Sequence, residues 1–218
     1  MKVCTDSCLF GAWIPSVKGG QVLDIGTGTG LLTLMLAQRS SPETHFTALD
    51  IDPLALHDAK TNFSNAPWHK QITCIEADGL VWAEQNTCIF DVIICNPPFF
   101  EKHLKGPDAH KNSALHAGAL HAAALAKIIK QLLKKEGRAF VLYPPHEAGT
   151  FEAEALQHHL YAMTNTTVHN RVGDKPFRQM LEIGHEKAQT KQDSIAIRVG
   201  NEYSPAFVNL LKSYYLAL

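Results

Sequence analysis

The sequence predicts an α/β fold with a doubly wound, mostly parallel sheet of seven strands that ends in an antiparallel hairpin. Two observations carry this prediction. From residue 21 onward, short β-branched apolar runs alternate with segments of helical period, and the turns between them are short. At 218 residues, of which 45% are hydrophobic, the chain is large enough to bury one sizeable core. We therefore expect a single domain over residues 1–218.

The first five strands are expected where β-branched apolar runs stand between turn residues. They are placed at 21–26, 44–50, 71–77, 90–95 and 137–143. The helices that join them are expected at 30–39, 53–65, 79–85 and 114–135. Gly137 lies just past the last helix, at a position where glycine commonly ends a helix.

The pattern changes after residue 145. A helix near 147–160 leads to two extended runs, 161–172 and 178–185, whose connection has a length suited to an antiparallel hairpin. We expect this hairpin to close one edge of the sheet. A third run at 194–199 precedes a terminal helix that opens with Pro205, because proline is favoured in the first turn of a helix.

Composition excludes several classes of protein. The formal net charge is -1, so any nucleic-acid site is expected to be a local basic patch. The five cysteines are odd in number and lack C-x-x-C spacing, which argues against a disulfide framework and a structural zinc site. No apolar segment approaches the roughly 18 residues that a membrane span requires. A cytoplasmic protein with no membrane association is expected, and we expect a monomer.

A glycine-rich loop between the first strand and the first helix predicts a cofactor site. Gly26, Gly28 and Gly30 have the spacing G-x-G-x-G, whereas a dinucleotide fingerprint has G-x-G-x-x-G. Asp24 stands two residues ahead and would repel a pyrophosphate, which disfavours a nicotinamide-dependent dehydrogenase. It suits a cofactor that carries an ammonium group, such as S-adenosylmethionine. The alternative is a tight turn without a ligand.

Two further acids follow strands and favour the cofactor over a simple turn. Asp50 ends the second strand, where its carboxylate can accept hydrogen bonds from both hydroxyls of a ribose. Asp78 follows the third strand and is placed to meet an adenine amino group. In open α/β sheets, ligands bind outside the carboxyl ends of the strands. Asp52 is expected to cap the helix that starts at Pro53 rather than to bind ligand.

The tetrapeptide Asn96, Pro97, Pro98 and Phe99 directly follows the fourth strand and predicts the chemistry. An amine on an aromatic base is a poor nucleophile because its lone pair is delocalised, so a catalyst needs two acceptors for its N–H bonds. The side-chain oxygen of Asn96 and the main-chain carbonyl of Pro97 can supply them, and the prolines fix the loop. Phe99 offers a ring on which an extruded base can stack. The alternative interpretation is a turn after a strand.

Beyond these motifs, the chain resembles a family: the tRNA adenine-N6-methyltransferases that modify the adenosine 3′ of the anticodon, position 37, in a valine tRNA. The resemblance covers nearly the whole sequence. The matching stretches are Lys2-Val3, Thr5-Asp6, Leu9 to Trp13, the glycine loop, Asn96 to Phe100, Lys105, Pro107-Asp108, Lys111-Asn112, His116, Pro176-Phe177-Arg178, and Tyr203 to Leu216.

The resemblance implies a Rossmann-like methyltransferase fold and S-adenosylmethionine as methyl donor. The cofactor contacts it implies, in addition to the three acids and three glycines above, are Thr5, Thr27, Ile51, Gly79 and Asn96. Basic residues after the catalytic loop and in the hairpin are the candidate contacts to tRNA phosphates. These candidates are Lys102, Lys105, Lys111, His116, Lys175 and Arg178.

Other functions remain open at this point. The tetrapeptide is shared with methyltransferases of DNA adenine, of ribosomal-RNA guanine N2 and of protein glutamine, so it indicates a planar amine and not one substrate. A non-catalytic RNA-binding protein is the alternative of another class. Four histidines, at 103, 110, 116 and 121, follow the motif without the i,i+4 spacing of metal-binding helices, so no metal is predicted.

Overall fold

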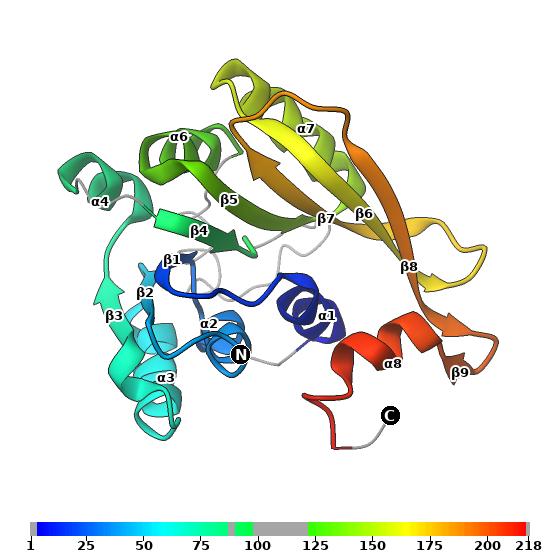
Figure 1. Ribbon diagram of the computed structural model, residues 1–218, viewed down its shortest axis with the longest axis horizontal. Coiled ribbons are helices and arrows are strands. Elements are labelled where there is room, and N and C mark those ends of the chain that lie inside the picture. Colours follow the sequence, from blue (N-terminus) through cyan, green and yellow to red (C-terminus); the bar gives the residue numbers. More distant parts are fainter. Residues whose placement is uncertain (1–3, 87–89, 98–121, 217–218) are drawn as a thin grey trace, which may run out of the picture.

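The computed structural model describes residues 4–86, 90–97 and 122–216, which form one mixed sheet with helices on both faces (Figure 1). The helices are α1 (Thr5–Trp13), α2 (Leu31–Ala37), α3 (Pro53–Ser64), the short η1 (His69–Gln71), α4 (Gly79–Gln85), α6 (Ala122–Leu132), α7 (Pro145–Gln157) and α8 (Pro205–Leu211). The strands are β1 (Gly20–Ile25), β2 (Thr44–Asp50), β3 (Ile72–Glu76), β4 (Phe90–Cys95), β5 (Leu133–Tyr143), β6 (Tyr161–Arg171), β7 (Pro176–Gly184), β8 (Lys191–Val199) and β9 (Glu202–Tyr203).

The strand order is β3-β2-β1-β4-β5-β7-β6-β8-β9. The pairings show that β7 and β9 run against the other strands, so the seven remaining strands end at one common edge, here called the carboxyl edge. The order reverses between β1 and β4, and such a reversal is where open α/β sheets bind ligands. Ile25 pairs with Cys95 across this boundary, which places the glycine loop and Asn96 side by side.

Two hydrophobic layers sandwich the sheet because neighbouring strand residues point to opposite faces. Leu23 and Ile25 of β1 pack with α4, α6 and α7, whereas Val22 packs with α1, α2 and α8. Figure 1 shows these two groups of helices on opposite sides of the sheet, with α3 beside α2. The doubly wound α/β prediction is therefore confirmed.

Most predicted elements agree with the structure within about two residues, but the end of the helix expected at 114–135 does not. The helix ends at Leu132, and β5 starts at Leu133 rather than at residue 137. The register between β4 and β5 shifts here, because Phe90 pairs with Leu133 and Val92 with Arg138. A side chain at Gly137 would lie 3.0 Å from the carbonyl oxygen of Asp91, so this glycine permits a bulge instead of ending a helix.

The side of the sheet formed by its last strands, β7, β6, β8 and β9, also differs from the prediction. The hairpin of β6 and β7 is present, but it lies inside a nine-stranded sheet among the described residues rather than closing a seven-stranded one. Strand β8 starts at Lys191, three residues earlier than expected, and pairs in parallel with β6. A parallel partner that returns after a long connection leaves no local signal in the sequence, which explains the error.

Helix α1 was not predicted at all. Its N-cap residue, Cys4, makes no side-chain capping bond, and Gly11 interrupts its helical pattern. The glycine is needed because a side chain there would meet the sulfur of Met35 at 2.7 Å, where α1 crosses α2. This close crossing holds the start of the chain against the sheet.

Candidate active site

The glycine loop adopts a conformation that glycine alone tolerates well. Gly26, Gly28 and Gly30 have φ angles of 70°, 58° and 83°, in the left-handed region. At Gly30 a side chain would also collide with the ring of Phe63 on α3. The backbone nitrogen of Thr27 donates to the carbonyl of Leu49 at 2.8 Å and ties the loop to β2. The loop is thus held in this conformation by its own glycines and by its bond to β2.

Asp24 lies beneath this loop and is 1% exposed. Its Oδ2 accepts hydrogen bonds from the hydroxyls of Thr27 (2.8 Å) and Thr33 (2.7 Å). Its Oδ1 is buried and has no partner among the described residues. Burial raises the pKa of Asp24 to about 6, the two threonine hydroxyls oppose the rise, and the nearby Asp50 carboxylate adds to it. A buried acceptor of this kind fits an incoming ammonium group.

Asp50 stands at the carboxyl end of β2 and faces the same loop. Its Oδ2 accepts from the backbone nitrogen of Gly28 at 2.7 Å, and its Oδ1 accepts from the nitrogen of Asp52 at 3.0 Å. The carboxylate therefore has a fixed orientation at the mouth of the loop. Asp52 caps α3 by accepting from Leu54 nitrogen at 2.9 Å, with Pro53 in the first turn, which confirms the prediction made for it.

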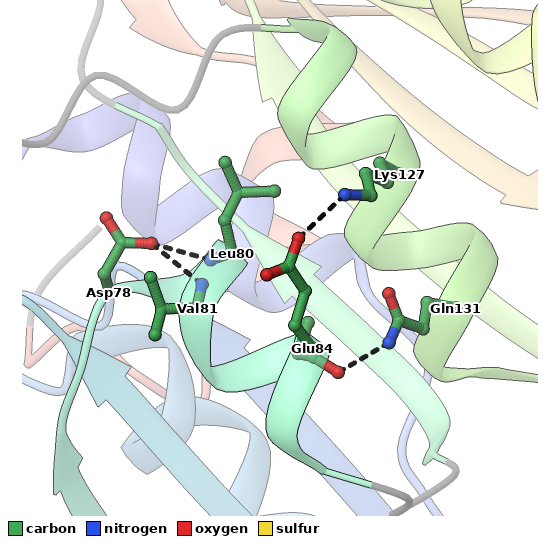
Figure 2. A network of polar contacts seen from close by, with 7 residues as sticks. Asp78, Leu80, Val81, Glu84, Lys127 and Gln131 are labelled. Carbon is green, nitrogen blue, oxygen red and sulfur yellow. Dashed lines mark hydrogen bonds and ion pairs between the residues drawn. The ribbon is translucent and has the colours of Figure 1, made fainter.

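Asp78 caps α4, a role that the sequence analysis did not foresee. Its Oδ1 accepts from the backbone nitrogens of Leu80 (2.9 Å) and Val81 (3.1 Å). Figure 2 shows these two bonds and shows the second carboxylate oxygen pointing away from α4. An ion pair of Lys127 with Glu84 at 2.9 Å joins α4 to α6 in the same view. One oxygen of Asp78 thus sets the helix and the other faces outward.

Asn96 follows β4 and has its side-chain amide held at one end. Its Nδ2 donates to the hydroxyl of Ser7 on α1 at 2.9 Å. Its Oδ1 is buried and finds no hydrogen-bond partner within 4–86, 90–97 and 122–216. Pro97 is buried beside it. The site therefore presents an unpaired acceptor next to the glycine loop, which is what activation of an amine requires.

The thiol of Cys95, next to Asn96, is not a nucleophile at neutral pH. It is fully buried. Burial raises its pKa well above the ordinary value, and the carboxylates of Asp24 and Asp50 raise it further. The site thus favours direct transfer over a covalent enzyme intermediate.

Two residues that the sequence analysis missed as partners hold α1 over the site. Asp6 accepts at Oδ2 from Nε of Arg178 on β7 at 2.8 Å, in an ion pair whose side chains are 14% and 22% exposed. Ser7 meets Asn96 from the next position. Both Thr5-Asp6 and Pro176-Phe177-Arg178 were conspicuous as family-like stretches, but only the fold brings them together.

The remaining predicted residues fall into three groups. Thr5 opens α1 and is exposed, Gly79 opens α4, and Ile51 is 41% exposed directly after Asp50. Lys175 is exposed in the turn between β6 and β7, which the register places at the carboxyl edge. The predicted residues that lie outside the described part of the chain are Pro98, Phe99, Lys102, Lys105, Lys111 and His116.

The described residues contain neither a candidate metal cluster nor a helix that could span a membrane. No group of three or more histidine, cysteine, aspartate or glutamate side chains there could hold a metal ion. None of the helices in 4–86, 90–97 and 122–216 is long and apolar enough to cross a membrane.

Comparison with known proteins identifies the class of enzyme to which the fold belongs. Residues 5–137 match the family described as the methyltransferase small domain. Among solved structures, a predicted O-methyltransferase from Agrobacterium tumefaciens shares the fold with a TM-score of 0.74 at 15% identity, over 94% of this chain and 95% of that one. A putative RNA methyltransferase from Pyrococcus horikoshii gives a TM-score of 0.58 at 12% identity, over 82% and 79%. The fold and site define a methyltransferase of the Rossmann-like class.

Sequence relatives define the family more narrowly. A protein of Bacteroides thetaiotaomicron named tRNA1(Val) (adenine(37)-N6)-methyltransferase is 38% identical over all of this chain and 92% of its own length. A protein of the same name from Tolumonas auensis is 33% identical over all of this chain and 91% of its own length. The chain belongs to the family of proteins that carry this name.

Proposed function

We propose that this protein transfers a methyl group from S-adenosylmethionine to the N6 amine of an adenosine, the one 3′ of the anticodon in a valine tRNA. One observation carries the proposal: the buried, unpaired Oδ1 of Asn96 lies where β4 meets the glycine loop after β1. The names of the relatives support the choice of tRNA adenine at position 37 as substrate.

The residues fit the cofactor. Bound S-adenosylmethionine supplies an electrophilic methyl group on a positively charged sulfur. The unpaired Oδ1 of Asp24 would take the ammonium group, because that oxygen is a buried acceptor without a donor among the residues that the structure describes. Asp50 would hold the ribose, and the outward oxygen of Asp78 would face the adenine amine, with Gly26, Thr27, Gly28, Gly30, Ile51 and Gly79 around them. No metal is needed for this chemistry.

The chain's own groups then prepare the amine. Oδ1 of Asn96 accepts one N–H of the target amine, and the carbonyl of Pro97 accepts the other, so the lone pair is drawn out of conjugation and directed at the methyl carbon. The donor would supply the methyl group to this lone pair and would leave as a neutral thioether, so no enzyme group needs to carry the methyl. The methylated amine then releases one proton to solvent. Phe99 would stack on the base.

The test is a labelling experiment on unmodified tRNA. The protein is incubated with methyl-labelled S-adenosylmethionine and total tRNA from cells that lack the modification, and the product is digested to nucleosides. We expect labelled N6-methyladenosine, and a loss of at least about a hundredfold in rate for Asn96→Ala, since one of two preorganised acceptors is removed. Label only in guanosine, or no label at all, would refute the proposed substrate.

A further inference from the structure

Three hydrogen bonds connect β7 to the catalytic asparagine through the first turn of α1. Arg178 Nε donates to Asp6 Oδ2 at 2.8 Å. Asp6 Oδ1 in turn accepts from the backbone nitrogen of Ser7 at 2.9 Å. The hydroxyl of Ser7 accepts from Asn96 Nδ2 at 2.9 Å. The four residues come from three elements and form one continuous chain, here called the α1 chain.

The α1 chain engages the nitrogen end of the Asn96 amide and leaves the oxygen end for the ligand. The oxygen and nitrogen of an asparagine amide have nearly the same shape, so only hydrogen bonding fixes their positions. With Nδ2 engaged by Ser7, the buried Oδ1 is the atom left to accept. If the amide were reversed, its N–H groups would oppose the N–H groups of a target amine. The reaction therefore depends on the orientation that Ser7 favours.

The ion pair at the start of the α1 chain is buried enough to hold its two side chains in one position. Its side chains are 14% and 22% exposed, whereas those of Lys191 and Asp193, paired at 3.9 Å, are 72% and 52% exposed. Solvent and salt screen a half-buried pair less than an exposed one. Asp6 uses both carboxylate oxygens, one on Arg178 and one on the backbone of Ser7, so the first turn of α1 is held from two sides.

We propose that Ser7, Asp6 and Arg178 are positioning residues that lock the Asn96 amide with Oδ1 toward the target amine. The inference rests on the proposed methyl transfer to an amine. It gives Arg178 a function inside the protein, distinct from the RNA contact that its basic charge suggested. It also gives a common role to Thr5-Asp6 and Pro176-Phe177-Arg178, two stretches far apart in sequence that the ion pair joins.

The first test separates turnover from binding. Ser7→Ala is expected to lower kcat about five- to tenfold, because one oriented hydrogen bond is lost, while the KM for tRNA and the cofactor affinity stay within about twofold. Ser7→Thr keeps the oxygen and restores most of the rate. Ser64→Ala is the control, because within the described residues Ser64 Oγ bonds only the nearby Thr61 carbonyl on α3. Unchanged kcat in Ser7→Ala would overturn the proposal.

The second test distinguishes positioning from RNA contact at Arg178. Asp6→Asn and Arg178→Gln are each expected to lower kcat about threefold or more, and the double variant to be no slower than the worse single one. Arg138→Gln breaks the 3.6 Å pair with Glu182 at the opposite edge of the sheet and serves as control. If Arg178 bound phosphate instead, Arg178→Gln would raise the KM for tRNA while Asp6→Asn left kcat unchanged, which would overturn the proposal.

A third measurement needs neither RNA nor turnover. Nitrogen NMR of protein with labelled asparagine shows the side-chain amide of Asn96, assigned by its loss in Asn96→Ala. In Ser7→Ala this signal is expected to shift or broaden, and in Ser64→Ala to remain. An unmoved signal would refute the α1 chain. If the signal moves in Ser7→Ala but the wild-type protein methylates no tRNA, the proposed substrate is refuted and the α1 chain is not.

Discussion

At the scale of the residue, the site combines two buried acceptors with different tasks. Asp24 Oδ1 and Asn96 Oδ1 both lack a partner among the described residues, and they lie at the carboxyl ends of neighbouring strands, Asp24 within β1 and Asn96 directly after β4. A buried polar atom without a partner is costly, and proteins retain it mainly where a ligand completes it. The carboxylate suits a cation and the amide suits a neutral amine. The pair therefore matches a charged donor and an uncharged acceptor of the methyl group.

The raised pKa of Asp24 predicts how stability depends on pH. Its pKa is about 6 in the folded protein against an ordinary value of 3.8, so the folded state binds this proton more tightly than the unfolded state. Its contribution to stability is complete below about pH 4 and is lost as the pH rises through 6. We expect the free energy of unfolding of the wild type, relative to Asp24→Asn, to fall by up to about 3 kcal/mol between pH 4 and 7.

Urea denaturation of the ligand-free proteins at several pH values measures this difference. Saturating S-adenosylmethionine should remove most of the fall, because an ammonium group beside Oδ1 favours the ionised carboxylate. A difference between the two proteins that does not vary with pH would contradict the role of Asp24.

At the scale of the element, the sequence predicted well wherever a period and a local signal coincide. Strand 44–50 and helix 79–85 match in full, and Asp52 with Pro53 marked the start of α3. The failures have non-local causes. Helix α1 depends on packing against α2, the start of β5 on a bulge that only Gly137 permits, and the place of β8 on a parallel partner far away in sequence.

Local signals in the sequence likewise predicted only part of the site. The sequence motifs predicted Asp24, Asp50 and Asn96 as site residues, because each stands at the carboxyl end of a strand that the sequence also predicted. Ser7 stands 89 residues from Asn96, and no spacing rule joins them. The capping role of Asp78 could have been predicted from its place directly ahead of α4, as the same role was for Asp52 ahead of α3.

The turn of the glycine loop gives a prediction with a matched control. Gly30→Ala adds a side chain at a φ of 83° and against Phe63, and should destabilise the protein by about 1–3 kcal/mol. Gly149→Ala lies within α7 with nothing within 4 Å of the added carbon, and should stabilise by up to about 1 kcal/mol. Chemical denaturation measures both, and equal effects in the two variants would contradict this account of the loop.

At the scale of the whole molecule, lysines near the two edges of the sheet differ in whether they form ion pairs. At the edge where the parallel strands begin, Lys134 pairs with Asp91 at 2.8 Å and Lys191 with Asp193 at 3.9 Å. Lys175 is exposed at the carboxyl edge and takes part in none of the ion pairs found among the described residues. An exposed cation at the carboxyl edge is available to a phosphate even though the formal net charge is -1.

Lys175 therefore gives a prediction about RNA binding. Lys175→Gln should weaken tRNA binding by a few fold and reduce the slope of log affinity against log salt by about 1, because one phosphate contact is lost. Lys191→Gln removes an equal charge from the opposite edge and should change neither quantity. Fluorescence titration at several salt concentrations measures both, and equal effects of the two substitutions would show that Lys175 makes no local contact.

The ion pair of Asp6 with Arg178 has a consequence for biosynthesis. Its members are 172 residues apart, so Asp6 leaves the ribosome long before its partner has been made. The glycine loop and β4 are complete well before β7, and these parts can form while translation continues. The orientation of Asn96 would be set only once β7 has joined the sheet. Catalytic competence would then mark the end of folding, since the last link to Asn96 comes from β7.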